Sequence, residues 1–215
     1  MIIGICGFIG SGKDTIADYL VNFHEFRRDS FAATLKDAVS QVFSWDRELL
    51  EGRTKQAREW REQVDTWWAE RLGIPTLTPR WVLQYWGTEV LRRGFHDDIW
   101  IASLEARLRN SKDNIVISDC RFPNEILAIK NAGGKVIWVQ RGDLPWWYDI
   151  AVRANQNNKD ARQVLVSHNV HASETAWVGT NFDATVDNNS SIEKLYSTLS
   201  NLLEGRFESK VRQVV

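Results

Sequence analysis

The chain has 215 residues, with 27 lysines and arginines against 28 aspartates and glutamates, so its formal net charge is −1. This length suits one large domain, or a core with an inserted subdomain, and it allows a sizeable apolar interior. A charge balance this close gives no general attraction for nucleic acid or for an anionic membrane, and we expect neither as a partner. Any anion site must therefore be local.

The cysteines and the first residues are typical of a cytoplasmic protein. Cys6 and Cys120 each end an apolar run, which favours reduced, buried thiols over a disulfide framework. The opening stretch, MIIGICGF, lacks the basic region and the long apolar region of a signal peptide. No stretch approaches the roughly 18 apolar residues needed to span a bilayer. We expect the chain to work in the cytoplasm.

The chain opens with a predicted strand, a glycine-rich loop and a helix. Residues 2–6 (IIGIC) form a short β-branched apolar run that ends at glycine, as a buried strand does. Residues 14–23 then place Ile16 and Leu20 on one face at helical spacing. Residues 26–32 predict a second strand, with a weaker apolar signal.

Helices are expected over most of the next eighty residues. Thr78 followed by Pro79 is typical of a helix start, and pairs such as Lys55 with Glu59 support a helix through their i, i+4 spacing. This region is too long for one crossover helix, so we expect a helical insertion at about 45–110 beside the sheet. The helices are predicted at 34–43, 54–73, 78–94 and 97–110.

Strands return in the second half of the chain. Residues 114–120 and 135–141 are continuous apolar runs, and 182–188 carries the same signal less fully. Continuous runs indicate strands covered on both faces, as in a parallel sheet with helices above and below. Residues 191–205 predict the last helix, and 206–215 (RFESKVRQVV) are expected to be loose or swapped onto a neighbour.

The loop at residues 7–15, GFIGSGKDT, carries the clearest chemistry. It lies between a strand and a helix and fits the G-x-x-x-x-G-K pattern of phosphate-binding loops. Gly10 and Gly12 permit the positive φ angles that turn N–H groups inward, and Lys13 would reach the β- and γ-phosphates. The pattern predicts an α/β fold of the P-loop NTPase type, with three layers, a central mostly parallel sheet and a large helical insertion or lid.

Asp14 departs from the usual loop, which continues with a serine or threonine that reaches Mg²⁺. A carboxylate could take the place of that hydroxyl, directly or through water, because Mg²⁺ prefers oxygen ligands. Alternatively, Asp14 only caps the helix and Thr15 contacts phosphate. Both alternatives stay open at this point.

A second motif, SDCRFPNE at 118–125, stands between a predicted strand and a helix. Ligands of open α/β sheets sit beyond the carboxyl ends of the strands, which is where this motif falls. Asp119 is placed there like a Walker-B acid, and Arg121 like a clamp on phosphate. The two side chains could also simply pair with each other.

The segments GKDT, RWVLQYWGTEVLRRGF, DIW, SDCRFPNE and HASE occur in this order, and the series resembles the phage deoxynucleoside monophosphate kinase family. The resemblance runs from residue 2 to about residue 200, with looser matches at 45–75 and 141–164. That family also carries an aspartate after the loop lysine, so Asp14 is a shared trait.

The resemblance implies transfer of the γ-phosphoryl group from ATP, as co-substrate with Mg²⁺, to a deoxynucleoside monophosphate. It also implies a homodimer, and the host cytoplasm if the chain is encoded by a phage. Lys13, Asp119 and Arg121 would be catalytic. The donor site would comprise Gly10, Gly12, Lys13, Asp14 and Thr15, with Asp14 as the metal ligand. The acceptor site would comprise Arg58, Arg80, Gly87, Thr88, Trp100, Asp119, Arg121 and Glu125.

Several features qualify the resemblance. The T-even phage member has two basic residues inside the loop, where this chain has the uncharged FIG at 8–10, so arginines elsewhere would compensate. A lid is expected at about 142–175 because a closing segment must exclude water. Trp100 or Tyr85 would pack where a 2′-hydroxyl would lie. His168 and His171 favour a structural or lid role over a metal site.

Two points remain open between alternatives. Asn188 could lie beside the adenine, or its segment could cap the last helix through Ser190, which we prefer. The function could also be that of another P-loop small-molecule kinase, of the phosphomevalonate kinase type, which also shows a GKD loop. A P-loop ATPase or nucleotide switch without a small-molecule acceptor is the alternative from another class.

Overall fold

The computed structural model describes residues 1–109 and 111–205, and the tail predicted to be loose or swapped lies outside them. The chain divides into two compact units. Residues 31–109 form the second unit, and the described residues on either side of them form the first. The functional roles predicted for 45–110 and 142–175 stay predictions.

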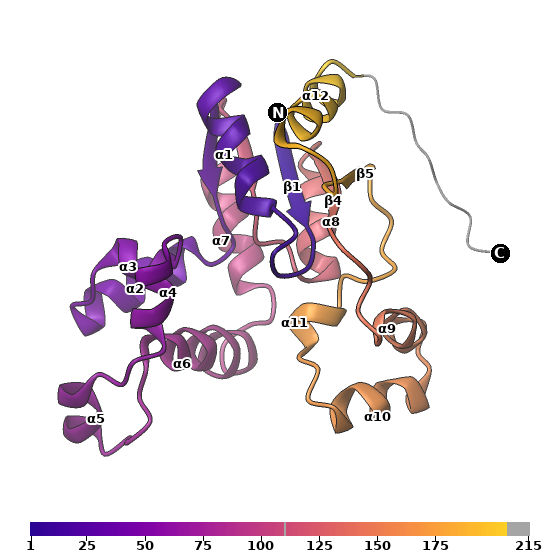
Figure 1. Cartoon of the computed structure of the whole chain (residues 1–215). Coiled ribbons are helices and arrows are strands. Elements are labelled where there is room, and N and C mark those ends of the chain that lie inside the picture. The colour runs from indigo at the N-terminus through magenta and orange to yellow at the C-terminus, as the bar shows by residue number, and fades with distance from the viewer. Residues whose placement is uncertain (110, 206–215) are drawn as a thin grey trace. The chain divides into compact units, whose positions relative to one another are not determined.

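The first unit is built on a parallel sheet of five strands in the order β2-β3-β1-β4-β5 (Figure 1). All five predicted strands are confirmed, and every neighbouring pair is parallel. The carboxyl ends of the strands therefore share one edge, and the glycine-rich loop leaves β1 there. The strands are β1 (Ile2–Cys6), β2 (Phe26–Asp29), β3 (Asn114–Ile117), β4 (Lys135–Gln140) and β5 (Ala184–Asp187).

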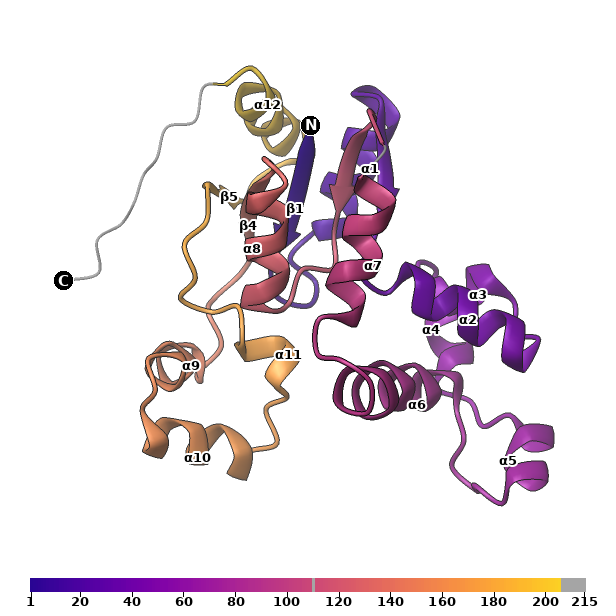
Figure 2. The ribbon, with the colours of Figure 1, turned by 180° about the vertical axis from the view of Figure 1, so that it is seen from behind.

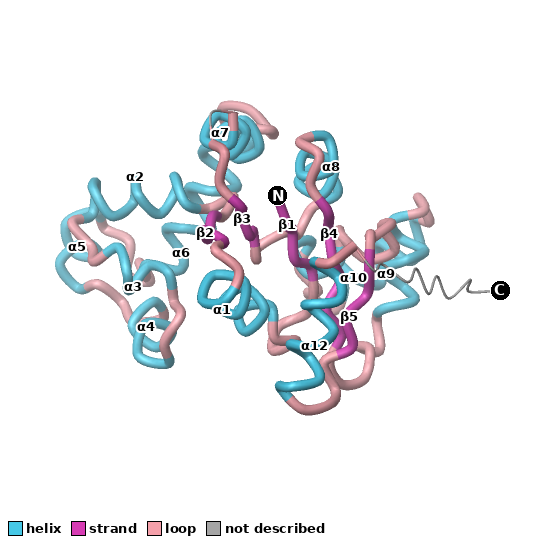
Figure 3. Tube along the Cα trace, turned by 90° about the horizontal axis from the view of Figure 1, so that it is seen from above, coloured by secondary structure: helices cyan, strands magenta, loops and turns pink. Residues whose placement is uncertain are grey.

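Helices cover both faces of this sheet. Seen from above, α1 (Lys13–Phe23) and α12 (Ile192–Leu203) lie on one face and α8 (Pro123–Asn131) on the other (Figure 3). Figure 2 shows α8 in front of the strands. A Cβ on Gly4 would meet Ile129 Cδ1 at 2.6 Å, so glycine lets α8 approach β1 closely. The three-layer α/β fold of the P-loop type is confirmed.

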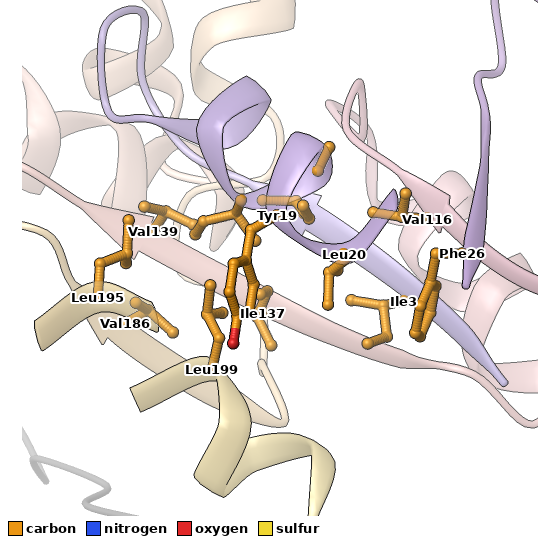
Figure 4. Packing of buried hydrophobic residues seen from close by; sticks show 13 residues of the cluster. Ile3, Tyr19, Leu20, Phe26, Val116, Ile137, Val139, Val186, Leu195 and Leu199 are labelled. Carbon is orange, nitrogen blue, oxygen red and sulfur yellow. The ribbon is translucent and has the colours of Figure 1, made fainter. Parts of the chain in front are cut away.

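The core between the sheet and helices α1 and α12 is apolar and continuous (Figure 4). Leu20 of α1 and Leu199 of α12 pack with Ile3 and Ile137 of the strands, and all four side chains are buried. This packing fixes where α1 begins, and hence the position of the loop before it. Cys6 and Cys120 are buried and unbridged, as predicted.

Three helices of the same unit lie between β4 and β5 in the chain. They are α9 (Tyr148–Asn155), α10 (Lys159–Ser167) and α11 (Ala172–Thr175). The side-chain amide of Asn155 donates to the carbonyls of Thr175 and Val178, each at 2.8 Å, and thereby ties the end of α9 to the segment after α11.

The second unit is helical throughout. Thr78 caps a helix by accepting from Trp81 N at 3.1 Å, with Pro79 at the first position, as predicted. The helix continues as a π-helix, so 78–94 is helical over nearly its whole predicted length. The elements are α2 (Ala33–Phe43), α3 (Arg47–Glu51), α4 (Lys55–Arg61), α5 (Thr66–Leu72), α6 (Pro79–Gln84), η1 (Tyr85–Arg93) and α7 (Ile99–Leu108).

The single helix predicted at 54–73 is wrong, because α4 ends at Arg61 and α5 begins at Thr66. Asp65 caps α5 by accepting from Trp68 N at 3.1 Å. Its other carboxylate oxygen accepts from the indole of Trp45 at 2.8 Å. Local capping and this distant contact outweigh the i, i+4 pairing that favoured one helix.

In the part of the chain that the structure describes, no helix combines the length and apolar character of a membrane span.

Candidate active site

The glycine-rich loop has the backbone conformation of a phosphate cradle. Gly10 has φ 79° and Gly12 φ 98°, both in the left-handed region that favours glycine. Gly12 precedes the first residue of α1, and Ser11 N donates to Phe8 O at 3.2 Å, which closes the turn. The amino end of an eleven-residue helix thus opens behind the loop, where its partial positive charge favours an anion.

Lys13 lies across this loop. Its ammonium group donates to the carbonyls of Gly7 and Phe8, each at 2.8 Å. Burial lowers the pKa of Lys13 and the charge of Arg121 lowers it further, whereas Asp14 and Glu174 raise it. Arg121, Asp14 and Glu174 are therefore all close enough to the loop to act on the charge of Lys13.

Asp14 lies in the first turn of α1 with its side chain 76% exposed. Arg28 of β2 binds its carboxylate at 3.2 Å and binds Asp18 at 2.9 Å. Among the described residues, no group of three or more His, Cys, Asp or Glu side chains could hold a metal by itself. A cation here would need oxygen ligands from elsewhere, as Mg²⁺ commonly takes them from water and phosphates.

The turn after β3 presents Arg121. Glu125 is buried, and its carboxylate accepts from the backbone N–H groups of Arg121 at 2.8 Å and Phe122 at 3.2 Å. Glu125 therefore fixes the start of α8 and the turn that carries Arg121. Asp119 lies half-buried in the same turn. Among the three residues of the motif, Arg121 is the most exposed.

Arg121 pairs with a carboxylate from the HASE segment. Its Nη1 lies 3.1 Å from Glu174 Oε1 and 3.5 Å from Ser173 Oγ, and the two charged side chains are 44% and 25% exposed. His171 caps α11 by accepting from Ser173 N at 3.2 Å, which is a structural contact, and a lid role for it stays a prediction. Glu174 thus links helix α11, on which it lies, to Arg121 of the turn after β3.

An aromatic cluster anchors the loop at Phe8. The Phe8 ring lies 4.7 Å from Trp177, 5.4 Å from Trp147 and 6.2 Å from Tyr148, measured between ring centroids. Trp177 is only 2% exposed. Phe8 therefore attaches the loop to the start of α9 and to the segment after α11, a contact that no local sequence pattern predicts.

Asn188, after β5, completes the loop from the far end of the chain. Its amide donates to Ser11 O at 2.9 Å, and a Cβ on Gly12 would overlap that amide. Ser191 caps α12 by accepting from Lys194 N at 3.4 Å, so the predicted cap by Ser190 is wrong by one position. The segment therefore both caps α12 and holds the loop.

The predicted acceptor residues of the second unit fall in two places. Arg58 on α4 donates to Arg53 O at 2.9 Å, and Arg80 on α6 pairs with Glu62 at 2.8 Å. Elsewhere, the indole of Trp100, only 7% exposed, donates to Gly87 O at 2.9 Å beside half-buried Thr88. The burial of Trp100, which lies on α7, favours a packing role against η1, and the packing of this residue where a 2′-hydroxyl would lie stays a prediction.

Two relatives of the chain are named as kinases of deoxynucleotide or deoxynucleoside monophosphates. No family model matches the chain. A protein of Acanthamoeba polyphaga mimivirus, provisionally named a deoxynucleotide monophosphate kinase, is 31% identical over 93% of this chain and 94% of its own. The deoxynucleoside-5′-monophosphate kinase of Escherichia phage T5 is 28% identical over 58% of this chain and 70% of its own.

Among solved structures, shikimate kinase from Aquifex aeolicus covers 96% of this chain and is covered over 98% of its own, with 12% sequence identity and a TM-score of 0.47. A likeness this distant adds nothing to the fold, which rests on the strand order and the loop geometry themselves.

Proposed function

Because the chain belongs to the deoxynucleoside monophosphate kinase family, we propose that it transfers the γ-phosphoryl group of ATP to the phosphate of a deoxynucleoside monophosphate. An oxygen of the acceptor phosphate bonds to the γ-phosphorus while the bond to the β,γ-bridging oxygen breaks, giving ADP and the deoxynucleoside diphosphate. The observation that carries the proposal is the phosphate loop between β1 and α1, with Lys13 drawn across it.

The loop residues bind the donor. Gly10 and Gly12 allow the backbone N–H groups to face the polyphosphate, and the ammonium of Lys13 neutralises its β- and γ-oxygens. In the structure this ammonium is satisfied by two loop carbonyls, with which phosphate oxygens would compete. Phosphoryl transfer needs mainly positioning and charge stabilisation, so no covalent intermediate on the protein is required.

Asp14 is the residue that would hold Mg²⁺ beside the polyphosphate, and Thr15 belongs to the donor site with it. The exposed carboxylate of Asp14 suits a cation that keeps several waters and takes its other ligands from phosphate. The bound ion would neutralise charge that develops on the phosphate oxygens. Arg28 keeps the Asp14 side chain at the start of α1 through its ion pair.

Arginines and the second unit recognise the acceptor. Arg121 clamps a phosphate oxygen, since arginine forks orient phosphates better than lysine point charges do. Asp119 orients the reacting groups from the same turn, and Glu125 positions that turn from below. Residues 142–175 act as the lid that excludes water, attached to the loop by the Phe8 cluster. The acceptor residues of the second unit are Arg58, Arg80, Gly87, Thr88 and Trp100.

A panel assay tests this function. The protein is incubated with Mg-ATP and each of the deoxynucleoside monophosphates, and both ADP and the deoxynucleoside diphosphate are separated and quantified. Equal amounts of the two products with at least one acceptor are expected. ADP released without acceptor would indicate an ATPase, and no diphosphate from any acceptor would overturn the proposal. The panel also defines which bases are accepted.

A further inference from the structure

The second unit contains an arginine cluster formed by Arg58, Arg61 and Arg80. Arg58 and Arg61 stand three residues apart on α4 and so share one side of the helix. Arg80 lies in the first turn of α6, which packs against α4. Burial lowers the pKa of Arg61, and the positive charges of Arg80 and Arg58 lower it further, so the three guanidinium groups act on one another.

The carboxylates around the cluster do not balance its charge. Glu62 pairs with Arg80 at 2.8 Å. Glu51, the other nearby carboxylate, is already bound by Lys36 at 2.7 Å and by Arg47. Burial raises the pKa of Glu51, but the two cations outweigh it and hold the pKa at about 2. Glu62 and Glu51 both raise the pKa of Arg61, but Glu62 already pairs with Arg80 and Glu51 with two other cations, which leaves an excess of positive charge around the three arginines.

The guanidinium of Arg61 packs where only a glycine at position 52 leaves room for it. It lies against Gly52, the residue after α3, which has φ 69°, and a methyl group there would overlap it. Arg61 Nε is buried and has no hydrogen-bond partner, and Nη1 reaches only Leu50 O at 3.5 Å. Buried donors in native proteins are nearly always satisfied, and an unmet one is costly. The donor therefore points to a bound anion.

We propose that Arg61 is a phosphate ligand that acts with Arg58 and Arg80 to bind the dianionic phosphate of the acceptor nucleotide. The inference rests on the proposed function and adds a residue to its acceptor site. The phosphate takes the place of Glu62 beside Arg80, because it carries more charge and more acceptor oxygens than a carboxylate. Arginine suits this position through its planar fork of donors.

Kinetics of Arg61→Gln test the assignment against Arg93→Gln. Arg93 lies in the same unit, is 72% exposed and pairs with Glu89 at 2.8 Å, so its loss controls for a general change of charge. We expect Arg61→Gln to raise the KM for the deoxynucleoside monophosphate about tenfold or more, with the KM for ATP unchanged. Arg61→Lys, which keeps the charge without the fork, should fall between wild type and Arg61→Gln.

A second measurement needs no catalysis. Inorganic phosphate should raise the Tm of the wild type and of Arg93→Gln, and raise that of Arg61→Gln much less. If the wild type phosphorylates no acceptor, the proposed function fails, while the phosphate measurement still tests the site. The inference is overturned if Arg61→Gln folds and keeps both the wild-type KM for the acceptor and the wild-type response to phosphate. Equal increases in both KM values would also overturn it.

Discussion

Replacement of Glu174 by glutamine tests how Arg121 is released for substrate. In the structure Glu174 holds Arg121 at 3.1 Å and stands close enough to Lys13 to raise its pKa. A phosphate that binds Arg121 must displace this carboxylate and is repelled by it. Glu174→Gln removes both obstacles, so we expect a lower KM for the nucleotide that Arg121 binds.

The exposure of the pair limits the size of the effect. Two unit charges 3.1 Å apart would attract by roughly 1 kcal/mol in bulk water and several times more at lower dielectric. The two side chains are 44% and 25% exposed, however, and ion pairs of this kind contribute about 0.2–1 kcal/mol after screening. About 1 kcal/mol corresponds to a fivefold change in an equilibrium constant. A decrease in KM of up to about fivefold is therefore expected.

Steady-state kinetics at low and high salt measure this change. The KM for the acceptor and the KM for ATP are determined separately, and the difference between wild type and Glu174→Gln should shrink as salt rises. Glu193→Gln, an exposed carboxylate on α12, is the matched control and should leave both constants unchanged. A lower kcat with both KM values unchanged would refute the reasoning, since Glu174 would then contribute to the bound state.

Three further predictions follow from the same contacts. Lys13→Ala should abolish transfer while the circular dichroism spectrum stays that of the wild type. In the wild type, kcat/KM should begin to fall below pH 10.5, the ordinary pKa of lysine, because the pKa of Lys13 is lowered and the ammonium loses its proton earlier. A kcat/KM that stays flat up to pH 10.5 would contradict this. Glu51→Gln should lower the free energy of unfolding at pH 7 by up to about 3 kcal/mol. Because the folded pKa is depressed, this stabilisation is present above pH 4.5 and disappears as pH falls towards 2, so urea unfolding at pH 7 and pH 3 should show a large and then a smaller difference. Phe8→Ala should lower the free energy of unfolding by about 2 kcal/mol, less than the loss of a fully buried phenylalanine side chain, and should raise the KM for ATP. Phe8→Leu should keep most of the stability and most of the affinity for ATP. An unchanged Tm of Phe8→Ala would exclude the anchoring role.

The sheet was predictable because its signals are local. The strands β1, β3 and β4 are buried over most of their length and appear as apolar runs, whereas β2 and β5 carry exposed residues and gave weaker signals. Glycines with Lys13 mark the loop directly. The break between α4 and α5 was missed because the charges at 54–73 fit one helix equally well. Asp65 instead serves as a cap and as an acceptor for Trp45, which lies twenty residues away.

The site was predictable only as a set of residues. The pair between Arg121 and Glu174 spans 53 positions, and no periodicity connects two such segments. Nothing in the sequence indicated the role of Phe8. The uncharged residues 8–10 indicated only that a basic contact to phosphate is absent, whereas in the structure Phe8 packs against Trp177. The contact of Arg61 with Gly52 depends on the turn between two short helices, which the charge spacing at 54–73 did not indicate.

The contact between Asn188 and the phosphate loop has a consequence for the order of events during synthesis. The loop leaves the ribosome first, but the amide that holds Ser11 O lies 177 residues later in the chain. A nascent chain therefore carries the loop sequence long before it has the group that fixes the loop. A chain without the segment after β5 therefore lacks one of the contacts that hold the loop, and a nucleotide bound at the loop would stabilise the completed molecule over its partly made forms.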